Sequence, residues 1–348
     1  MLGKGQFFVK ILVTGGAGYI GGTVAGLLAE NGHQAVIFDN LSHGRGDLLP
    51  SGVEFVEGEL ADRPALENLF TAAKALGQPF DGVLHFAALI EAGESMVHPE
   101  QFFRNNTAST LSLLEAILAH GPRRLVFSST AAVYGGPEAV PIPESARLLP
   151  INAYGESKLL VEQMLGWFHR IHGLRSASLR YFNVAGAAGA LEGPGGITRG
   201  EAHEPESHLI PLVLDVALGR RPSIRIYGDD YPTPDGTCIR DYIHVSDLTD
   251  AHLLALNALE TAPAAHGRLI FNLGNGQGFS VREVIESARR VTGLPIPAEN
   301  HPRRSGDPAV LVASSEKAIS ELGWKPKYTQ LDEILRTAWI WHQKRYAK

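Results

Sequence analysis

The sequence has little of what marks a secreted, membrane or nucleic-acid-binding protein. It contains one cysteine, Cys238, in 348 residues, so an internal disulfide is excluded and a cytoplasmic location is expected. No apolar run reaches the roughly 20 residues of a membrane span, and the N-terminal residues do not resemble a signal peptide. The net charge is −6 and the basic pairs are scattered, which argues against binding to nucleic acid or to anionic membranes.

The histidine pattern also lacks a clear metal site. His203 and His208 fall in a predicted loop, and His169 and His172 fall on a predicted helix. Neither pair has thiol or clear carboxylate companions in the pattern, and such histidines usually serve as solvated or capping residues. We therefore expect no metal. Cys238 is expected to be an inert buried thiol rather than a catalytic one.

Strand and helix patterns alternate through the first half, which predicts an α/β fold, a doubly wound parallel (Rossmann) sheet with a smaller mixed α/β C-terminal lobe. Strands are expected at 9–13, 34–38, 53–56, 82–86, 125–129 and 175–180, and helices at 64–76, 99–119, 152–172, 209–218, 245–259, 281–292, 315–322 and 331–343. The expected domains are 1–182, for the dinucleotide, and 183–348, for the substrate, with about 238–272 packing back on the sheet. The glycine- and proline-rich stretch 184–208 is expected to cover a substrate.

The stretch Ile11 to Gly22, ILVTGGAGYIGG, predicts a strand, a tight turn and a helix start. In the spacing of Gly15, Gly18 and Gly21, the first glycine permits the turn, the second lets a diphosphate approach, and the third lets helix and strand pack closely. The next strand leads into Asp39, whose carboxylate can accept hydrogen bonds from an adenosine ribose and would repel a 2′-phosphate. The pattern therefore predicts a dinucleotide site that prefers NAD to NADP.

A second group of residues indicates redox chemistry. Tyr154 and Lys158 are four residues apart on one predicted helix, so both side chains lie on the same face. An adjacent ammonium and a cationic nicotinamide would both favour the phenolate of the tyrosine, which could then act as a base near neutral pH. Thr130, at the end of the preceding strand, could hold the same substrate oxygen. Each feature alone occurs often by chance, whereas their order along the chain does not.

Taken together, these motifs resemble the extended short-chain dehydrogenases/reductases, and within them the UDP-hexose 4-epimerases. The resemblance runs through TGGAGYIG, Asp39-Asn40, HFAA, SSTAAVYG, the segment from Asn152 to Lys158, and LRYFNVAGA. In the second half it includes GDDYPTPDGTCIRDYIHVSDL and Pro302-Arg303-Arg304 with Gly306-Asp307. The resemblance thus covers nearly the whole chain.

The resemblance implies an NAD-dependent interconversion of UDP-glucose and UDP-galactose at C4 through a transient 4-keto sugar. Tyr154 would take the O4 proton, Thr130 would hold that oxygen, and Lys158 would bind the nicotinamide ribose. Contacts with NAD are expected from Gly15, Gly18, Tyr19, Ile20, Gly21, Asp39, Asn40, Glu59, Leu60, Phe86, Ala87, Ala88, Asn105, Ser128, Tyr154, Lys158 and Tyr181. Relatives commonly carry Asp where this chain has Glu59, which puts one adenine contact in doubt.

Contacts with the UDP-hexose are expected from Thr130, Tyr154, Asn183, His208, Leu209, Tyr227, Arg240, Arg304, Asp307 and Leu311. Asn183 and the two arginines would grip the diphosphate, since guanidinium groups offer forked donors. Leu311 would lie beside the sugar 2-substituent, where tyrosine is associated with rejection of N-acetyl sugars and cysteine or serine with their acceptance. Leucine matches neither pattern, and Leu311 could instead only pack a strand.

Three alternatives stay open at this point. One is another NAD-dependent nucleotide-sugar epimerase, and a second is a nucleotide-sugar 4,6-dehydratase. Such dehydratases carry an Asp-Glu pair after the threonine, whereas Ala131 and Ala132 follow Thr130 here and cannot move protons. The third is a non-catalytic NAD-sensing protein on the same fold, which would be expected to lack Tyr154 or Lys158. The resemblance also suggests a homodimer joined through helices 99–119 and 152–172.

Overall fold

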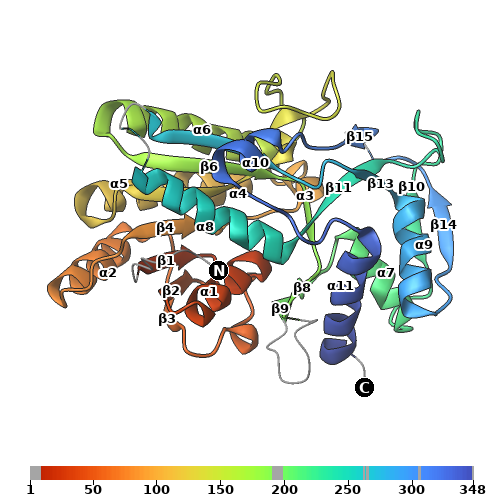
Figure 1. The fold of residues 1–348 in the computed structure, drawn as a ribbon, viewed down its shortest axis with the longest axis horizontal. Coiled ribbons are helices and arrows are strands. Elements are labelled where there is room, and N and C mark those ends of the chain that lie inside the picture. Colours follow the sequence, from red (N-terminus) through yellow and green to blue (C-terminus); the bar gives the residue numbers. More distant parts are fainter. Residues whose placement is uncertain (1–8, 190–198, 262, 264–265, 305–306, 347–348) are drawn as a thin grey trace.

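The computed structural model describes residues 9–189, 199–261, 263, 266–304 and 307–346 (Figure 1). Its centre is a seven-stranded sheet in the order β12-β6-β5-β4-β1-β2-β3, in which every neighbouring pair is parallel. The strands are β1 (Lys10–Thr14), β2 (Gln34–Asp39), β3 (Glu54–Glu57), β4 (Gly82–His85), β5 (Arg124–Thr130), β6 (Arg175–Tyr181) and β12 (Arg268–Leu273). The predicted doubly wound sheet is therefore confirmed, and the strand order reverses between β1 and β4, where such sheets bind ligands.

Helices cover both faces of this sheet (Figure 1). One face packs on α1 (Tyr19–Glu30) and α8 (Val245–Thr261), with Val24, Leu28 and Leu256 in its core. The other face packs on α2 (Arg63–Ala75), α5 (Ser109–His120) and α6 (Ala153–His172), with Phe70, Leu113 and Leu165 in its core. Both α8 and β12 come from the second half of the chain. The first completes the helix layer that contains α1, and the second forms one edge of the sheet.

Both ends of α6 carry capping residues. At the start of α6, the Asn152 side chain accepts a hydrogen bond from the Gly155 backbone N at 2.8 Å, so Asn152 is the N-cap. At its end, Gly173 has φ +68°, the left-handed conformation that commonly terminates helices. These caps fix the register of the helix that carries Tyr154 and Lys158.

The prediction of one continuous helix at 99–119 is wrong, because a π-helical turn interrupts it. The stretch is divided into α4 (Pro99–Phe102), a π-helical turn at Phe103–Ala108 and α5. π-helical turns are rare and often lie at functional sites. Within this turn, Asn106 holds the chain after β4, because its side chain accepts from the backbone N of Leu89 and donates to its carbonyl.

The second lobe is mixed. The strands β7 (Asn183–Ala185), β13 (Gly278–Ser280) and β15 (Val310–Leu311) all pair with β11 (Ile239–His244), and β10 (Ile224–Tyr227) pairs with β14 (Ala298–His301). Its core lies between α7 (Leu209–Ala217), α9 (Val281–Thr292) and α11 (Leu331–Tyr346). The remaining elements are α3 (Ala92–Ser95), α10 (Glu316–Leu322), β8 (Ala187–Ala188), β9 (Arg199–Gly200), and short 3-10 turns at Gly46–Leu48 and Ala131–Tyr134.

Two further observations concern the predicted segments. The substrate cover expected at 184–208 lies partly outside the described residues, because 190–198 are not described. The N-terminal residues 1–8 are also outside the described part of the chain. Within the described ranges, every helix is too short or too polar to cross a membrane.

Candidate active site

The glycine turn between β1 and α1 is tight enough that side chains would not fit. Gly15 has φ +73°, and a Cβ atom there would lie 2.4 Å from the backbone N of Ala87. A Cβ at Gly21 would lie 2.4 Å from the carbonyl oxygen of Gly15, so this glycine lets the helix approach the turn. A Cβ at Gly18 would meet only that same carbonyl, at 3.3 Å. The open side of Gly18 is where a diphosphate can approach bare backbone.

A cavity of about 310 Å³ lies along the carboxyl ends of the sheet strands; we call it the sheet-edge cavity. It brings together every residue expected to contact NAD except Lys158, and it includes Thr130, Asn183 and His208 as well. It is lined by Gly15, Gly18, Tyr19, Ile20, Gly21, Asp39, Asn40, Glu59, Leu60, Phe86, Ala87, Ala88, Asn105, Ser128, Thr130, Tyr154, Tyr181, Asn183 and His208, among others. Glycine backbone at one end and an acid at a strand end fit a dinucleotide.

The acidic end of this cavity is held in place by backbone donors. The two carboxylate oxygens of Asp39 accept hydrogen bonds from the backbone N of Ala17 at 3.0 Å and of Leu41 at 2.8 Å. Next to it, the Asn40 side chain donates to Glu59 at 2.9 Å. Two carboxylates therefore lie at this end of the cavity, and the charge of Asp39 would disfavour a 2′-phosphate on a ribose bound there.

The predicted base lies inside the same cavity, but burial works against its ionisation. Burial raises the pKa of Tyr154 to about 12, although a hydrogen bond with Thr130 lowers it in part. Burial also lowers the pKa of Lys158 to about 7. The expectation that the lysine ammonium favours the phenolate is therefore not met by the chain alone, because desolvation outweighs it.

Lys158 lies behind the cavity wall and is not among the residues that line it. Its Nζ donates to the carbonyl oxygen of Ser128 at 2.9 Å and lies 5.0 Å from the centre of the Phe127 ring. Since Ser128 lines the cavity, the lysine is one residue removed from the space that a ligand would occupy.

A second cavity of about 470 Å³, the lobe cavity, lies in the C-terminal lobe and contains the residues expected to bind UDP. Asn183 and His208 line both cavities. A ligand in the sheet-edge cavity and a ligand in the lobe cavity would therefore meet at these two residues. Other lining residues are Leu209, Tyr227, Arg240, Arg304 and Asp307. Arg240 forms an ion pair with Asp307 at 2.6 Å, and the Arg304 guanidinium lies 4.1 Å from the Tyr227 ring centre.

Leu311 is the expected substrate residue that lines neither cavity. It is half-buried on β15, pairs in register with Arg240, and packs against the apolar cluster that contains Ala131, Tyr134 and Phe182. Phe182 does line the sheet-edge cavity. An influence of Leu311 on the sugar would thus be transmitted through this cluster.

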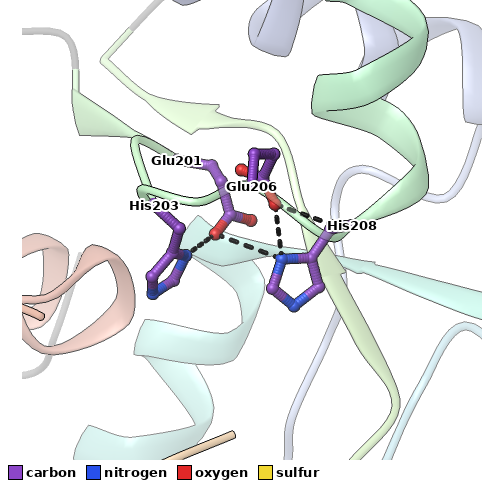
Figure 2. Close-up of side chains that lie close together, drawn as sticks. All are labelled: Glu201, His203, Glu206 and His208. Atoms are coloured by element: carbon purple, nitrogen blue, oxygen red, sulfur yellow. Dashed lines mark hydrogen bonds and ion pairs between the residues drawn. The ribbon is translucent and has the colours of Figure 1, made fainter. Parts of the chain in front are cut away.

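The expectation that His203 and His208 lack carboxylate companions is wrong. Glu201 accepts from His203, and Glu206 accepts from the Nδ1 of His208 at 2.9 Å (Figure 2). Glu201, His203 and His208 all line the sheet-edge cavity. The alternating spacing E-x-H-x-x-E-x-H is the signal in the sequence that could have identified this group, which requires only that one loop fold back on itself.

Known proteins resemble this chain over almost its full length. Residues 11–274 match the NAD dependent epimerase/dehydratase family. A UDP-glucose 4-epimerase from Streptomyces lividans is 53% identical over 333 residues, 96% of each chain. The crystal structure of UDP-glucose 4-epimerase from Brucella ovis in complex with NAD has a TM-score of 0.87 at 43% identity and covers 95% of this chain and 97% of its own.

The UDP-glucose 4-epimerase from Bifidobacterium longum, in complex with NAD+ and UDP, has a TM-score of 0.87 at 35% identity. That match covers 97% of this chain and 98% of the other. The sequence match and the shared fold extend through both lobes, so this chain belongs to the NAD-dependent epimerase/dehydratase family.

Proposed function

We propose that this chain interconverts UDP-glucose and UDP-galactose at C4, with NAD as a tightly bound cofactor and a 4-keto sugar as the transient product. The observation that carries the proposal is the junction of the two cavities at Asn183 and His208. One cavity holds a tyrosine and a dinucleotide-type glycine turn, and the other holds two arginines. A nucleotide sugar would thereby place its sugar near Tyr154 and its diphosphate near Arg240 and Arg304.

The residues of the chain would supply proton transfer and orientation. NAD, when bound in the sheet-edge cavity, would supply the hydride acceptor and a cationic nicotinamide in the cavity that Tyr154 lines. That charge would offset the burial that raises the Tyr154 pKa. Tyr154 then takes the proton from the sugar O4 while Thr130 holds the oxygen by a hydrogen bond. In the second half of the cycle Tyr154 would give the proton back to O4, so the sugar would be inverted at C4 without net oxidation.

Most of the binding energy would come from UDP, because the sugar must turn over between the two hydride transfers. Arg240, Arg304 and Asn183 are the proposed diphosphate ligands. Arg240 is preorganised for this role, since Asp307 holds its guanidinium at 2.6 Å. A 4,6-dehydratase needs an acid and a base to eliminate water from the sugar. Ala131 and Ala132, which follow Thr130, provide neither.

We extend the proposal to three finer points. The enzyme prefers UDP-glucose and UDP-galactose to their N-acetyl forms, because Leu311 is larger than cysteine, cannot hydrogen-bond an acetamido group, and would crowd the sugar through the cluster that contains Phe182. It is a homodimer joined through α4, α5 and α6, and this is supported by Trp167 and Ile171 on α6, which are 59% and 64% exposed. It works in the cytoplasm, a compartment that suits the buried free thiol of Cys238.

The test needs no added cofactor. The purified protein is denatured and its ultraviolet spectrum is recorded for released NAD, and the native protein is incubated with UDP-galactose alone. We expect about one NAD per chain and the appearance of UDP-glucose. UDP-galactose that stays unchanged in protein shown to contain NAD would refute the proposal, and the Tyr154→Phe variant prepared in parallel controls for contaminating epimerase.

A further inference from the structure

The loop between β9 and α7 contains four potential metal ligands that the proposed reaction does not use as a group. Glu201, His203, Glu206 and His208 each offer one ligand atom, and these four atoms all lie within 4.8 Å of one another (Figure 2). All four side chains point toward one centre from within eight consecutive residues. We propose that this group, the Glu–His cluster, is a binding site for one divalent transition-metal ion of the zinc class.

The cluster has the donor set that such ions prefer. Two imidazole nitrogens and two carboxylate oxygens provide four ligands, the number that zinc takes in structural sites. Imidazole ligands favour zinc and its first-row neighbours over magnesium and calcium, which prefer oxygen alone. The Nδ1 of His208 lies 2.9 Å from Glu206 and 3.6 Å from Glu201, so small side-chain rotations suffice to direct all four atoms at a common ion.

The charge of the cluster also calls for two positive charges. The side chains of Glu201 and Glu206 are only 9% and 12% exposed, and two carboxylates removed from water require neutralisation. In the metal-free chain each carboxylate pairs with an imidazole, Glu201 with His203 and Glu206 with His208. A divalent cation placed among the four ligand atoms would neutralise both carboxylates.

The backbone around the cluster is held before any ion binds. The indole N of Trp341 on α11 donates to the carbonyl oxygen of Glu201 at 2.7 Å. The backbone N atoms of Ser207 and His208 both donate to Glu206, at 2.7 and 2.8 Å. Ligands held in this way lose less freedom on binding, which favours a defined site.

The location gives the ion a structural task. Glu201 directly follows β9, and His208 precedes α7 as its N-cap residue. Because three cluster residues line the sheet-edge cavity, an ion would tie the connection between the two elements into one wall of that cavity. We therefore expect metal binding to raise the thermal unfolding midpoint, since the ion binds the folded chain only.

The test measures the metal itself, independently of epimerase activity. Protein dialysed against EDTA and then freed of chelator is titrated with Zn²⁺ by calorimetry, and the loaded protein is measured by zinc X-ray absorption. We expect one saturable equivalent per chain and a first shell of N and O atoms at about 2.0–2.1 Å. His203→Gln and Glu206→Gln should each weaken binding at least ~10-fold, because even indirect ligand supports contribute 10–100-fold.

His98→Gln is the matched control. His98 lies on the surface 3.5 Å from Glu94 and 3.7 Å from Glu100. It therefore has two glutamate neighbours but is not part of a group of four ligands like the Glu–His cluster. The His98→Gln variant should still bind one saturable equivalent of Zn²⁺ per chain. No saturable Zn²⁺ binding in the parent, affinity unchanged in both cluster variants, or a sulfur atom in the metal shell would overturn the proposal. The absorption measurement on the parent remains decisive should a variant fail to fold.

Discussion

Lys158 donates a hydrogen bond from its Nζ to the carbonyl oxygen of Ser128 at 2.9 Å, in a position that is 2% exposed. Burial lowers the pKa of this lysine to about 7, far below the value of about 10.4 for a free lysine. The charged form is thus destabilised by the fold. Because its pKa lies near neutral pH, Lys158 makes the stability of the folded chain depend on pH.

We expect Lys158 to make a contribution to the stability of the apoprotein that increases as the pH rises from about 7 to about 10, while the contribution of His203 and His208, whose pKa values are raised, decreases with pH. Below pH 7 Lys158 is protonated in both the folded and the unfolded chain, so the cost of burying the charge is fully present. Above pH 7 the folded chain binds fewer protons than the unfolded chain, and the cost falls with rising pH. The full difference for this one group is on the order of 4 kcal/mol, measurable as the change, across this range, in the difference between the urea midpoints of the parent and of a Lys158 variant.

Lys158→Met should remove this rising contribution and stabilise the apoprotein at pH 6. Lys327→Met is the control, because the ion pair with Asp250 raises the pKa of Lys327 and its loss should leave the slope between pH 7 and 10 as in the parent. An unchanged slope in Lys158→Met would show that another group titrates.

Tyr154→Phe is expected to reduce turnover at least ~100-fold, since a positioned base typically contributes 10²–10⁴, while UDP affinity stays nearly unchanged. Initial rates with UDP-galactose and calorimetry with UDP separate the two effects. Tyr231→Phe is the control, because the Tyr231 hydroxyl is buried without a hydrogen-bond partner and its removal should leave turnover intact. Near-normal turnover in Tyr154→Phe would exclude Tyr154 as the base.

NAD should bind the apoprotein far more tightly than NADP, because Asp39 presents a carboxylate where the 2′-phosphate would lie. Asp39→Asn should narrow this preference, since the amide keeps an acceptor and loses the charge. Glu57→Gln removes a charge from the register partner of Asp39 on β3 and should leave the ratio unchanged. Equal affinity of the parent for both dinucleotides, measured by calorimetry, would contradict the assignment.

Arg240→Ala and Arg304→Ala should each weaken UDP binding, because each removes charge-assisted hydrogen bonds worth about 1.5–3 kcal/mol. The neighbouring Arg303 contacts Asp230 and the Tyr231 ring instead, so Arg303→Ala provides a control for loss of one positive charge. UDP affinity that is unchanged in both Arg240 and Arg304 variants would place the diphosphate elsewhere.

Leu311→Ser should shift the ratio of kcat/KM for UDP-N-acetylgalactosamine and UDP-galactose toward the N-acetyl sugar. Apolar pockets discriminate by roughly 10–200-fold, which limits the expected change, and Leu311 would act through the cluster that contains Phe182, since it lines neither cavity. Val310→Ser, on the neighbouring position of β15, is the control. A ratio that stays at the parent value in Leu311→Ser would show that this residue does not set specificity.

The sequence alone determined the features that depend on local spacing. Alternating periodicity predicted the parallel sheet, and the spacing of Gly15, Gly18 and Gly21 predicted the tight turn, because a helix or a turn is specified by residues only a few positions apart. The four-residue spacing of Tyr154 and Lys158 likewise placed them on one helix. The residues expected around NAD come together because parallel strands end at the same edge.

Tertiary structure decided what depends on desolvation and on long-range contact. Spacing does not reveal that Lys158 lies behind the cavity wall, that burial raises the Tyr154 pKa, or that Leu311 lines neither cavity. The π-helical turn at Phe103–Ala108 and the convergence of Glu201 and Glu206 on the histidines were also not predicted. Each of these results from how chain segments pack in three dimensions, which sets the dielectric environment and the neighbours of every buried group.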